Sequence, residues 1–258
     1  MQAAPQIGSH WLPVGGGRPR IIAHRGASAD APENTLAAFK LAREQGADGV
    51  ELDVMRCRSG EVVVFHDDDL SRLGGRPDQV RQLTWDELRT VDLGGGERIP
   101  TLEMVLEAIG SMLLNVELKS PPTWGERFAD DGLAEAVSHI VLKKGGRAVE
   151  ERVLVSSFDP LLLGRFRLHA PRVATGLLFA ADQARPYREA WAAPLLRPTA
   201  VHPERLLVDA RAVRRWHQRG LGVNVWTVDD PAEIRLLAAL GVDGLITNRP
   251  AATRSVLR

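Results

Sequence analysis

The sequence predicts an α/β protein in which parallel strands and helices alternate and close into one TIM-type (β/α)₈ barrel. Three observations lead to this prediction. The 258 residues suit one large α/β barrel better than two domains of average size. Short apolar runs alternate along the chain with segments of helical pattern. Many of these runs are almost continuously apolar, which is typical of parallel strands buried on both faces.

Nine segments are predicted strands, one more than the barrel needs, and they are residues 21–24, 49–54, 62–66, 113–117, 153–156, 174–178, 200–202, 223–227 and 244–247. The third follows the second after a short turn at Gly60. We therefore expect residues 62–66 to return antiparallel, as the second arm of a hairpin. Residues 186–198 are too rich in proline to show a clear helix.

Several of the intervening helices have readable ends. Asn34 is the expected N-cap of a helix over residues 35–45. Thr84 and Glu87 have the spacing of a capping box, in which each side chain bonds the other residue's backbone. Asp230 precedes a proline and is the expected cap of the last long helix.

The composition excludes several classes of function. Lys plus Arg and Asp plus Glu balance at 33 each, so there is no overall basic field and no nucleic-acid partner is predicted. Cys57 is the single cysteine, which excludes an intramolecular disulfide and a thiolate metal site. No apolar run approaches the roughly 18 residues of a membrane span. Residues 1–19 read as a flexible leader without a secretory signal, before a domain over residues 20–258, and the expected location is the cytoplasm.

Carboxylates stand near the ends of two predicted strands. Glu51 and Asp53 face the same side of their strand, because side chains two residues apart point the same way. Glu117 ends another strand, and the carboxyl ends of barrel strands gather at one mouth. Such an all-oxygen set suits one hard divalent cation, Mg²⁺ or Ca²⁺, with Mn²⁺ as a further candidate.

Cationic and titratable side chains occur at the same strand ends. Arg25 can hold a phosphate bidentately, and Lys119 can hold one as a point charge. His24 and His66 exchange protons near neutral pH. The combination indicates metal-assisted cleavage of a phosphodiester.

A series of short blocks follows in order over about residues 20–250, and they include His24-Arg25-Gly26, Ala31-Pro32-Glu33-Asn34-Thr35, Glu51-Leu52-Asp53-Val54, Val63-Val64-Phe65-His66-Asp67, Asn115-Val116-Glu117-Leu118-Lys119 and Val225-Trp226-Thr227-Val228. In these blocks the chain resembles the glycerophosphodiester phosphodiesterase family. The resemblance implies a TIM barrel with a small insertion after the second strand, which fits residues 56–100. It also implies hydrolysis of a small glycerophosphodiester to sn-glycerol 3-phosphate and an alcohol.

The resemblance further implies a role for each residue of the predicted site. The catalytic acid and base are His24 and His66, the substrate contacts are Arg25, Lys119 and Trp226, and the metal ligands are Glu51, Asp53 and Glu117. Trp226 lines the pocket against the glycerol moiety in this interpretation. The sequence leaves open which histidine is the base, which alcohol is preferred and what the oligomeric state is.

The chain departs from the family pattern at a few positions. Asp229 stands where Asn is common, Asn248 stands where Asp often ends the last strand, and residues 57–59 replace a usual Thr and Asp. These departures bear on substrate preference more than on activity. The remaining histidines, His202 included, are expected to be structural or exposed, and residues 67–69 are expected to form a solvated turn.

Two other functions compete with the main one. A lysophospholipase D-like enzyme acting on lipid headgroups needs an apolar entry surface. Trp85, Trp124 and Trp191 are scattered along the sequence and predict no exposed aromatic cluster of that kind. A non-catalytic binder of phosphate compounds is free to lose a histidine or a metal ligand, whereas this chain keeps all of them.

Overall fold

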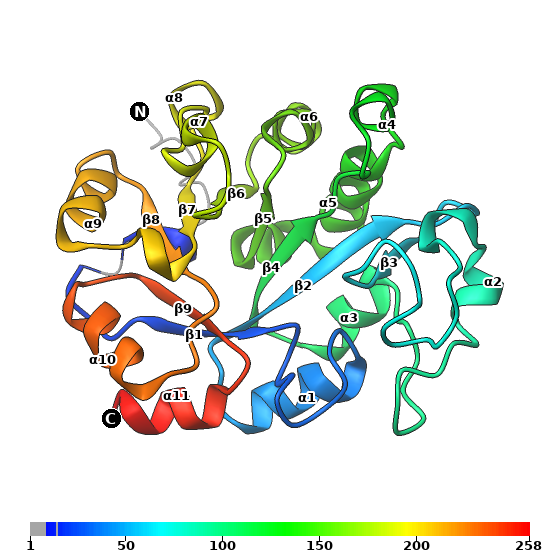
Figure 1. Ribbon diagram of the computed structural model, residues 1–258, viewed down its shortest axis with the longest axis horizontal. Coiled ribbons are helices and arrows are strands. Elements are labelled where there is room, and N and C mark those ends of the chain that lie inside the picture. The colour runs from blue at the N-terminus through cyan, green and yellow to red at the C-terminus, as the bar shows by residue number, and fades with distance from the viewer. Residues whose placement is uncertain (1–8, 14) are drawn as a thin grey trace.

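The computed structural model describes residues 9–13 and 15–258, and in them parallel strands close into a barrel. The sheet order is β1-β9-β8-β7-β6-β5-β4-β2, and β1 also pairs with β2, which closes the ring (Figure 1). This confirms the predicted fold class. The barrel strands are β1 (Arg20–His24), β2 (Gly49–Arg56), β4 (Leu113–Leu118), β5 (Val153–Ser157), β6 (Ala174–Phe179), β7 (Ala200–Pro203), β8 (Gly222–Val225) and β9 (Gly244–Thr247).

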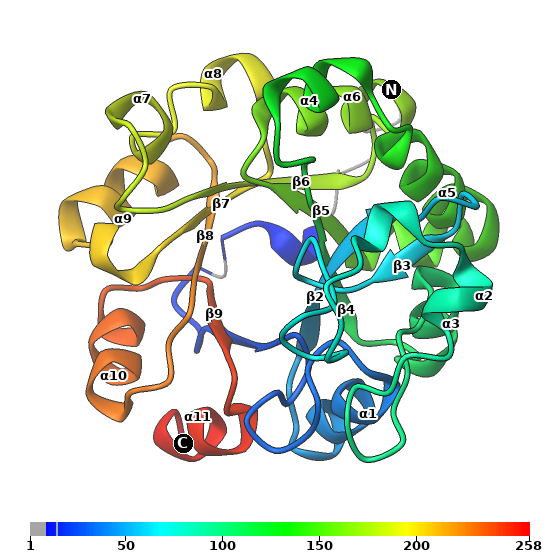
Figure 2. The same ribbon diagram turned by 45° about the vertical axis from the view of Figure 1, so that its right-hand side comes forward.

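Helices follow the strands and lie outside the ring (Figure 2). The longer ones pack apolar side chains on the outward faces of the strands, as a parallel sheet buried on both faces requires. Within the described ranges, no helix has the length and apolar character that crossing a membrane demands. The helices after these strands are α1 (Leu36–Glu44), α3 (Leu102–Ala108), α4 (Trp124–Ala129), α5 (Leu133–Arg152), α6 (Pro160–His169), α7 (Arg185–Arg188), α8 (Ala193–Leu196), η3 (Arg205–Leu207), α9 (Ala210–His217), α10 (Pro231–Ala239) and α11 (Pro250–Val256).

The expected hairpin forms after the second strand. Strand β3 (Val62–Val64) runs antiparallel to β2, with Val63 opposite Met55. The insertion continues through η2 (Val80–Gln82) and α2 (Trp85–Leu88), and it has an apolar cluster of its own. This cluster fixes the loop that carries His66 after β3.

The start of α1 differs from the prediction. The cap is Thr35, whose hydroxyl accepts a hydrogen bond from the Ala38 backbone N–H at 3.2 Å. Asn34 has a left-handed backbone (φ 58°), and its side-chain amide donates to Asp53 at 3.0 Å instead. The predicted cap at Asn34 was therefore wrong, because a buried carboxylate uses that amide. The capping box at Thr84 and the cap at Asp230 are confirmed.

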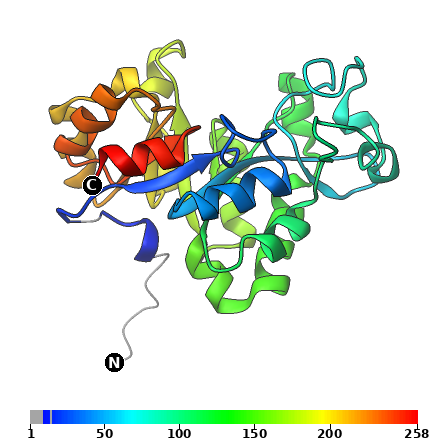
Figure 3. The same ribbon diagram turned by 90° about the horizontal axis from the view of Figure 1, so that it is seen from below.

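Trp11 closes the lower end of the barrel. It lies in η1 (Ser9–Trp11), is 1% exposed and packs with apolar residues that point into the ring. Its indole N–H donates to the Arg152 backbone carbonyl at 3.2 Å. Figure 3 shows this segment below the strands. Trp11 belongs to the predicted leader, of which residues 1–8 and 14 lie outside the described residues; the division at residue 19 stays a prediction.

Replacing Trp11 by Ala should lower the free energy of unfolding by about 3–5 kcal/mol, because it empties a buried aromatic site. The matched control is Trp191→Ala, since Trp191 is 61% exposed and its loss should change stability by less than about 0.5 kcal/mol. Urea unfolding followed by circular dichroism measures both. Equally small losses would contradict a structural role for Trp11.

Candidate active site

The turn after β1 places the positively charged side chain of Arg25 at the barrel mouth. Arg25 adopts a left-handed backbone (φ 55°), and its backbone N–H donates to a Glu51 carboxylate oxygen at 3.0 Å. Its guanidinium lies 2.8 Å from Glu33 and 3.2 Å from Asp53. Two carboxylates thus hold this side chain, and it lines the central cavity.

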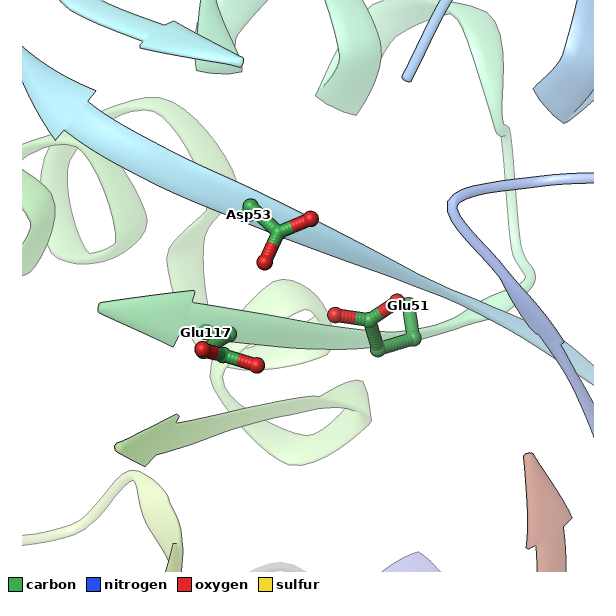
Figure 4. Close-up of side chains that lie close together, drawn as sticks. All are labelled: Glu51, Asp53 and Glu117. Atoms are coloured by element: carbon green, nitrogen blue, oxygen red, sulfur yellow. The ribbon is translucent and has the colours of Figure 1, made fainter. Parts of the chain in front are cut away.

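The strand register brings the three predicted metal ligands together. Asp53 on β2 lies opposite Glu117 on β4, and Glu51 is two residues earlier on the same face of β2. One oxygen from each of the three carboxylates lies within 4.8 Å of the others. Figure 4 shows these carboxylates gathered around one space between the two strands.

The electrostatics of this cluster are unfavourable without positive charge. Burial raises the pKa of Glu51 well above its ordinary value, and the charges of Asp53 and Glu117 raise it further. Burial also raises the pKa of Glu117. Burial acts the same way on Asp53, but the charges of Lys119 and Arg25 outweigh it and lower the pKa of Asp53. The Lys119 ammonium lies 3.1 Å from Glu117 and 3.6 Å from Asp53.

The donor set fits a hard divalent cation. All three ligands offer carboxylate oxygens, they are buried, and they are close enough to share one ion. The mutual repulsion that raises the pKa of Glu51 is the repulsion that a bound cation relieves. Glu51, Asp53 and Glu117 could therefore hold a metal ion.

His24 ends β1 and is fixed by a hydrogen-bonded chain. Its Nδ1 lies 2.7 Å from the side-chain oxygen of Asn248, which also accepts from the Ser28 hydroxyl. The amide nitrogen of Asn248 donates to Asp229 at 2.6 Å, so the oxygen of that amide faces the histidine. Nδ1 must then carry the hydrogen, and Nε2 keeps its lone pair, 4.0 Å from Glu51. Burial, with the charge of Arg25, lowers the pKa of His24.

The series of hydrogen bonds from His24 through Asn248 to Asp229 explains two of the departures from the family pattern. Asp229 also accepts from the Asn248 backbone N–H at 2.8 Å and from the Thr247 hydroxyl at 2.8 Å. The resemblance described in the sequence analysis leads us to expect Asn at the first position and Asp at the second. Because the side chains of Asp229 and Asn248 are hydrogen-bonded to each other, the two departures amount to one exchange of an amide and a carboxylate between bonded partners. Sequence reasoning missed this relation.

The hydrogen-bond partner of His66 is a carboxylate, whereas that of His24 is a neutral amide. It lies in the loop after β3, and its Nδ1 is 2.6 Å from a carboxylate oxygen of Asp67. The other oxygen of Asp67 accepts from Arg72 at 2.6 Å, and Arg72 also pairs with Glu33. Arg72 thereby lowers the pKa of Asp67 against the effect of burial. Residues 67–69 were expected to be a solvated turn, so the prediction was wrong for Asp67, which belongs to this network.

The predicted site residues meet at one cavity of about 260 Å³. Asp53 completes the carboxylate cluster beside it. The cavity is lined on one side by the predicted residues His24, Arg25, Glu51, His66, Glu117 and Lys119, and on the other by Phe158, Leu178, Trp226 and Ile246. A charged wall thus faces an apolar wall across a space that a small ligand can fill.

Trp226 is held on the apolar side. Its indole N–H donates to the His202 backbone carbonyl at 2.8 Å, and Phe158 meets its ring edge-on at 5.5 Å. His202 itself is fully buried, and burial lowers its pKa to about 3, so it is neutral. Its ring is hydrogen-bonded to Asn224 at 3.0 Å. This supports the expectation that His202 is structural.

Comparison with known proteins identifies the relatives of the chain. Residues 24–252 match the model of the glycerophosphoryl diester phosphodiesterase family. A glycerophosphodiester phosphodiesterase from Caldanaerobacter subterraneus subsp. tengcongensis is 34% identical over 92% of this chain and 97% of its own. A probable glycerophosphodiester phosphodiesterase from Mycobacterium tuberculosis is 32% identical, with 93% of each chain covered.

Solved structures agree with the sequence comparison. A putative glycerophosphoryl diester phosphodiesterase from Silicibacter pomeroyi superposes with a TM-score of 0.87 at 29% identity, over 97% of this chain and 96% of its own. A phosphodiesterase from Oleispira antarctica, in complex with the product sn-glycerol-3-phosphate, gives a TM-score of 0.82 at 30% identity, over 93% of this chain and 96% of its own.

Proposed function

The chain belongs to the glycerophosphoryl diester phosphodiesterase family, and on that basis we propose that it cleaves glycerophosphodiesters with one bound divalent cation and two histidines. It is a phosphoric diester hydrolase. The products are sn-glycerol 3-phosphate and an alcohol. The observation that carries the proposal is that a buried carboxylate cluster, two positively charged side chains (Arg25 and Lys119) and two histidines meet at one cavity.

Glu51, Asp53 and Glu117 hold the cation, which is Mg²⁺ or Ca²⁺, with Mn²⁺ as a further candidate. When bound, the cation supplies positive charge that stabilises the non-bridging phosphate oxygens in the transition state. Arg25 and Lys119, at the edge of the same cluster, bind the phosphate. The organic part of the substrate then lies against Trp226 on the apolar wall.

The partners of the two histidines assign their roles. His24 has a neutral amide at Nδ1 and a lone pair at Nε2, so it takes the proton from the attacking hydroxyl. His66 has the carboxylate of Asp67 at Nδ1, which fixes its ring. With His24 as the base, His66 is the group left to give a proton to the leaving alcohol. The attacking hydroxyl is the 2-hydroxyl of the substrate's glycerol, as the family resemblance implies. Water then opens the cyclic phosphate with the two proton transfers reversed.

Release of glycerol 3-phosphate from glycerophosphocholine tests the function directly. We expect no release in EDTA and full release once Mg²⁺, Ca²⁺ or Mn²⁺ is restored, because the carboxylates without a bound cation repel the negatively charged phosphate. A coupled glycerol 3-phosphate assay measures the rate. If the folded protein releases nothing with any of these cations, the proposed function is wrong, and an enzyme acting on lipid headgroups, then a non-catalytic binder, take its place.

Replacing His24 or His66 by Ala should lower kcat at least about a hundredfold, since each removes a proton-transfer group. The matched control is His139→Ala, because His139 is exposed on α5. Circular dichroism checks that each variant folds. Near-normal kcat in either variant would remove that histidine from the mechanism.

The exchanged pair gives a test of how His24 is positioned. Asp229→Asn places an amide N–H against a donor and Asn248→Asp sets two carboxylates together, so each should lower kcat about ten- to a hundredfold. The double variant D229N/N248D restores every donor to an acceptor, and its kcat should return to within a few-fold of the wild-type value. Steady-state kinetics separates kcat from KM. A double variant as slow as the product of the single losses would contradict the hydrogen-bonded chain.

A further inference from the structure

Two arginines of the insertion extend from it toward the barrel mouth. The insertion after β2 (residues 56–100) lies to one side of the ring and contains β3 and α2 (Figure 1). Arg72 follows Leu70 by two residues, and Arg81 follows Val80 directly. Leu70 and Val80 are fully buried in the insertion's own apolar cluster. Packing within the insertion therefore fixes the backbone segments that carry the two arginines.

Arg72 is connected to the Arg25 side chain through one carboxylate. Two nitrogens of the Arg72 guanidinium donate to the two oxygens of Glu33, at 2.7 and 2.9 Å. One of these oxygens also accepts from Arg25 at 2.8 Å. A two-point bond of this kind fixes the plane and direction of a carboxylate, which a single bond does not. Arg72 thereby sets the position from which Glu33 holds Arg25.

Arg72 also offsets the charge of Glu33. Burial acts to raise the pKa of Glu33, but the hydrogen bonds and charges of Arg72 and Arg25 outweigh it and lower that pKa. Glu33 therefore carries a negative charge that two arginines share. Without Arg72, Arg25 alone would balance that charge and would attract an anion less strongly. Arg72 thus leaves more of the positive charge of Arg25 for a phosphate.

Arg81 holds Lys119 by its backbone. The Lys119 carbonyl accepts from the Arg81 guanidinium at 2.6 Å, and the Lys119 N–H donates to the Val54 carbonyl of β2 at 3.0 Å. Lys119 is the first residue after β4, so these two bonds fix the end of that strand on both sides. Arg81 is itself paired with Asp131, just before α5. The Lys119 side chain starts from this fixed point, and its ammonium lies 3.1 Å from Glu117.

We propose that Arg72 and Arg81 are positioning residues for phosphate binding, and that Arg72 acts through Arg25 whereas Arg81 acts through Lys119. This rests on the proposed function, which assigns the phosphate to Arg25 and Lys119, and it names the residues that place those two side chains. Among the described residues, the lining of the catalytic cavity includes Arg25 and Lys119 but neither Arg72 nor Arg81. A side chain that is already held in place loses less entropy when the ligand binds.

Binding of sn-glycerol 3-phosphate, measured by titration calorimetry with Mg²⁺ present, tests this inference. Arg72→Gln and Arg81→Gln should each raise Kd at least about tenfold, because each removes charge-assisted hydrogen bonds that orient the site. Binding is the chosen measurement because Arg72 also contacts Asp67, the partner of His66, and kcat would combine both effects.

The matched control is Arg76→Gln. Arg76 lies in the same insertion and pairs with Asp78 at the surface, where the two side chains are 41% and 43% exposed. The control removes one positive charge, as the other variants do, and should change Kd by less than about twofold. Circular dichroism and thermal unfolding check that every variant is folded at the temperature of the titration.

A conservative variant separates position from charge. Arg72→Lys keeps the positive charge but has no fork to bond both oxygens of Glu33. Its Kd should therefore rise, although less than that of Arg72→Gln. A Kd for Arg72→Lys equal to the wild-type value would mean that charge alone matters, and it would contradict a positioning role for Arg72.

The two routes are separated by repeating the changes in an Arg25→Gln background. There Arg72→Gln should raise Kd by less than about twofold, because the side chain that it positions is gone. Arg81→Gln should keep its full effect in that background, since it acts through Lys119. An equal effect of Arg72→Gln with and without Arg25 would contradict the route through Glu33.

Failure of the inference and failure of the proposed function are distinguishable. If the wild-type protein binds no sn-glycerol 3-phosphate with Mg²⁺, Ca²⁺ or Mn²⁺, the proposed phosphate site fails, and the inference fails with it. If the wild-type protein binds it, and Arg72→Gln and Arg81→Gln bind it equally well, the inference alone is overturned.

Discussion

Burying three carboxylates within 4.8 Å of one another is strongly unfavourable, and the rest of the barrel mouth is arranged to offset that cost. The Lys119 ammonium lies between Asp53 and Glu117, and Arg25, in the turn after β1, pairs with Asp53. The charges that offset the cluster are those of the two residues proposed to bind the phosphate. The proposed cation and substrate anion would complete a charge distribution that the protein alone leaves unbalanced.

The two histidines stand at this cluster with different hydrogen-bond partners. His24 faces the amide of Asn248, with the carboxylate of Asp229 one step further away. His66 faces the carboxylate of Asp67 directly. An amide fixes the ring of His24 without adding charge, whereas a charged group fixes the ring of His66. The base and acid roles proposed for the two side chains rest on this difference.

Polar side chains, among them His202 and Asn224, pack inside the barrel beneath the site, and glycines opposite them leave the space they need. A side chain at Gly176 would collide with the ring of His202, and one at Gly244 would collide with the amide of Asn224. The space these glycines leave allows His202 to pack inside the ring and to hold Trp226 through its backbone carbonyl. The aromatic wall of the cavity therefore depends on residues one layer deeper in the barrel.

Much of this protein can be read from local patterns in its sequence. Apolar strands alternating with capped helices predict the barrel, and the two-residue spacing of Glu51 and Asp53 predicts a shared face. Once parallel strands close into a ring, their polar ends must meet at one mouth, so the main site residues follow as well. These inferences need only neighbours in sequence and one rule of topology.

The tertiary structure alone decided which distant side chains touch. Asp229 with Asn248 and His24, Arg72 with Glu33 and Asp67, and Asn34 with Asp53 join segments that no local pattern relates. Loop conformations follow from how each loop packs on its neighbours, and side-chain hydrogen bonds depend on distances of a few tenths of an ångström. Such information exists only once the chain has folded.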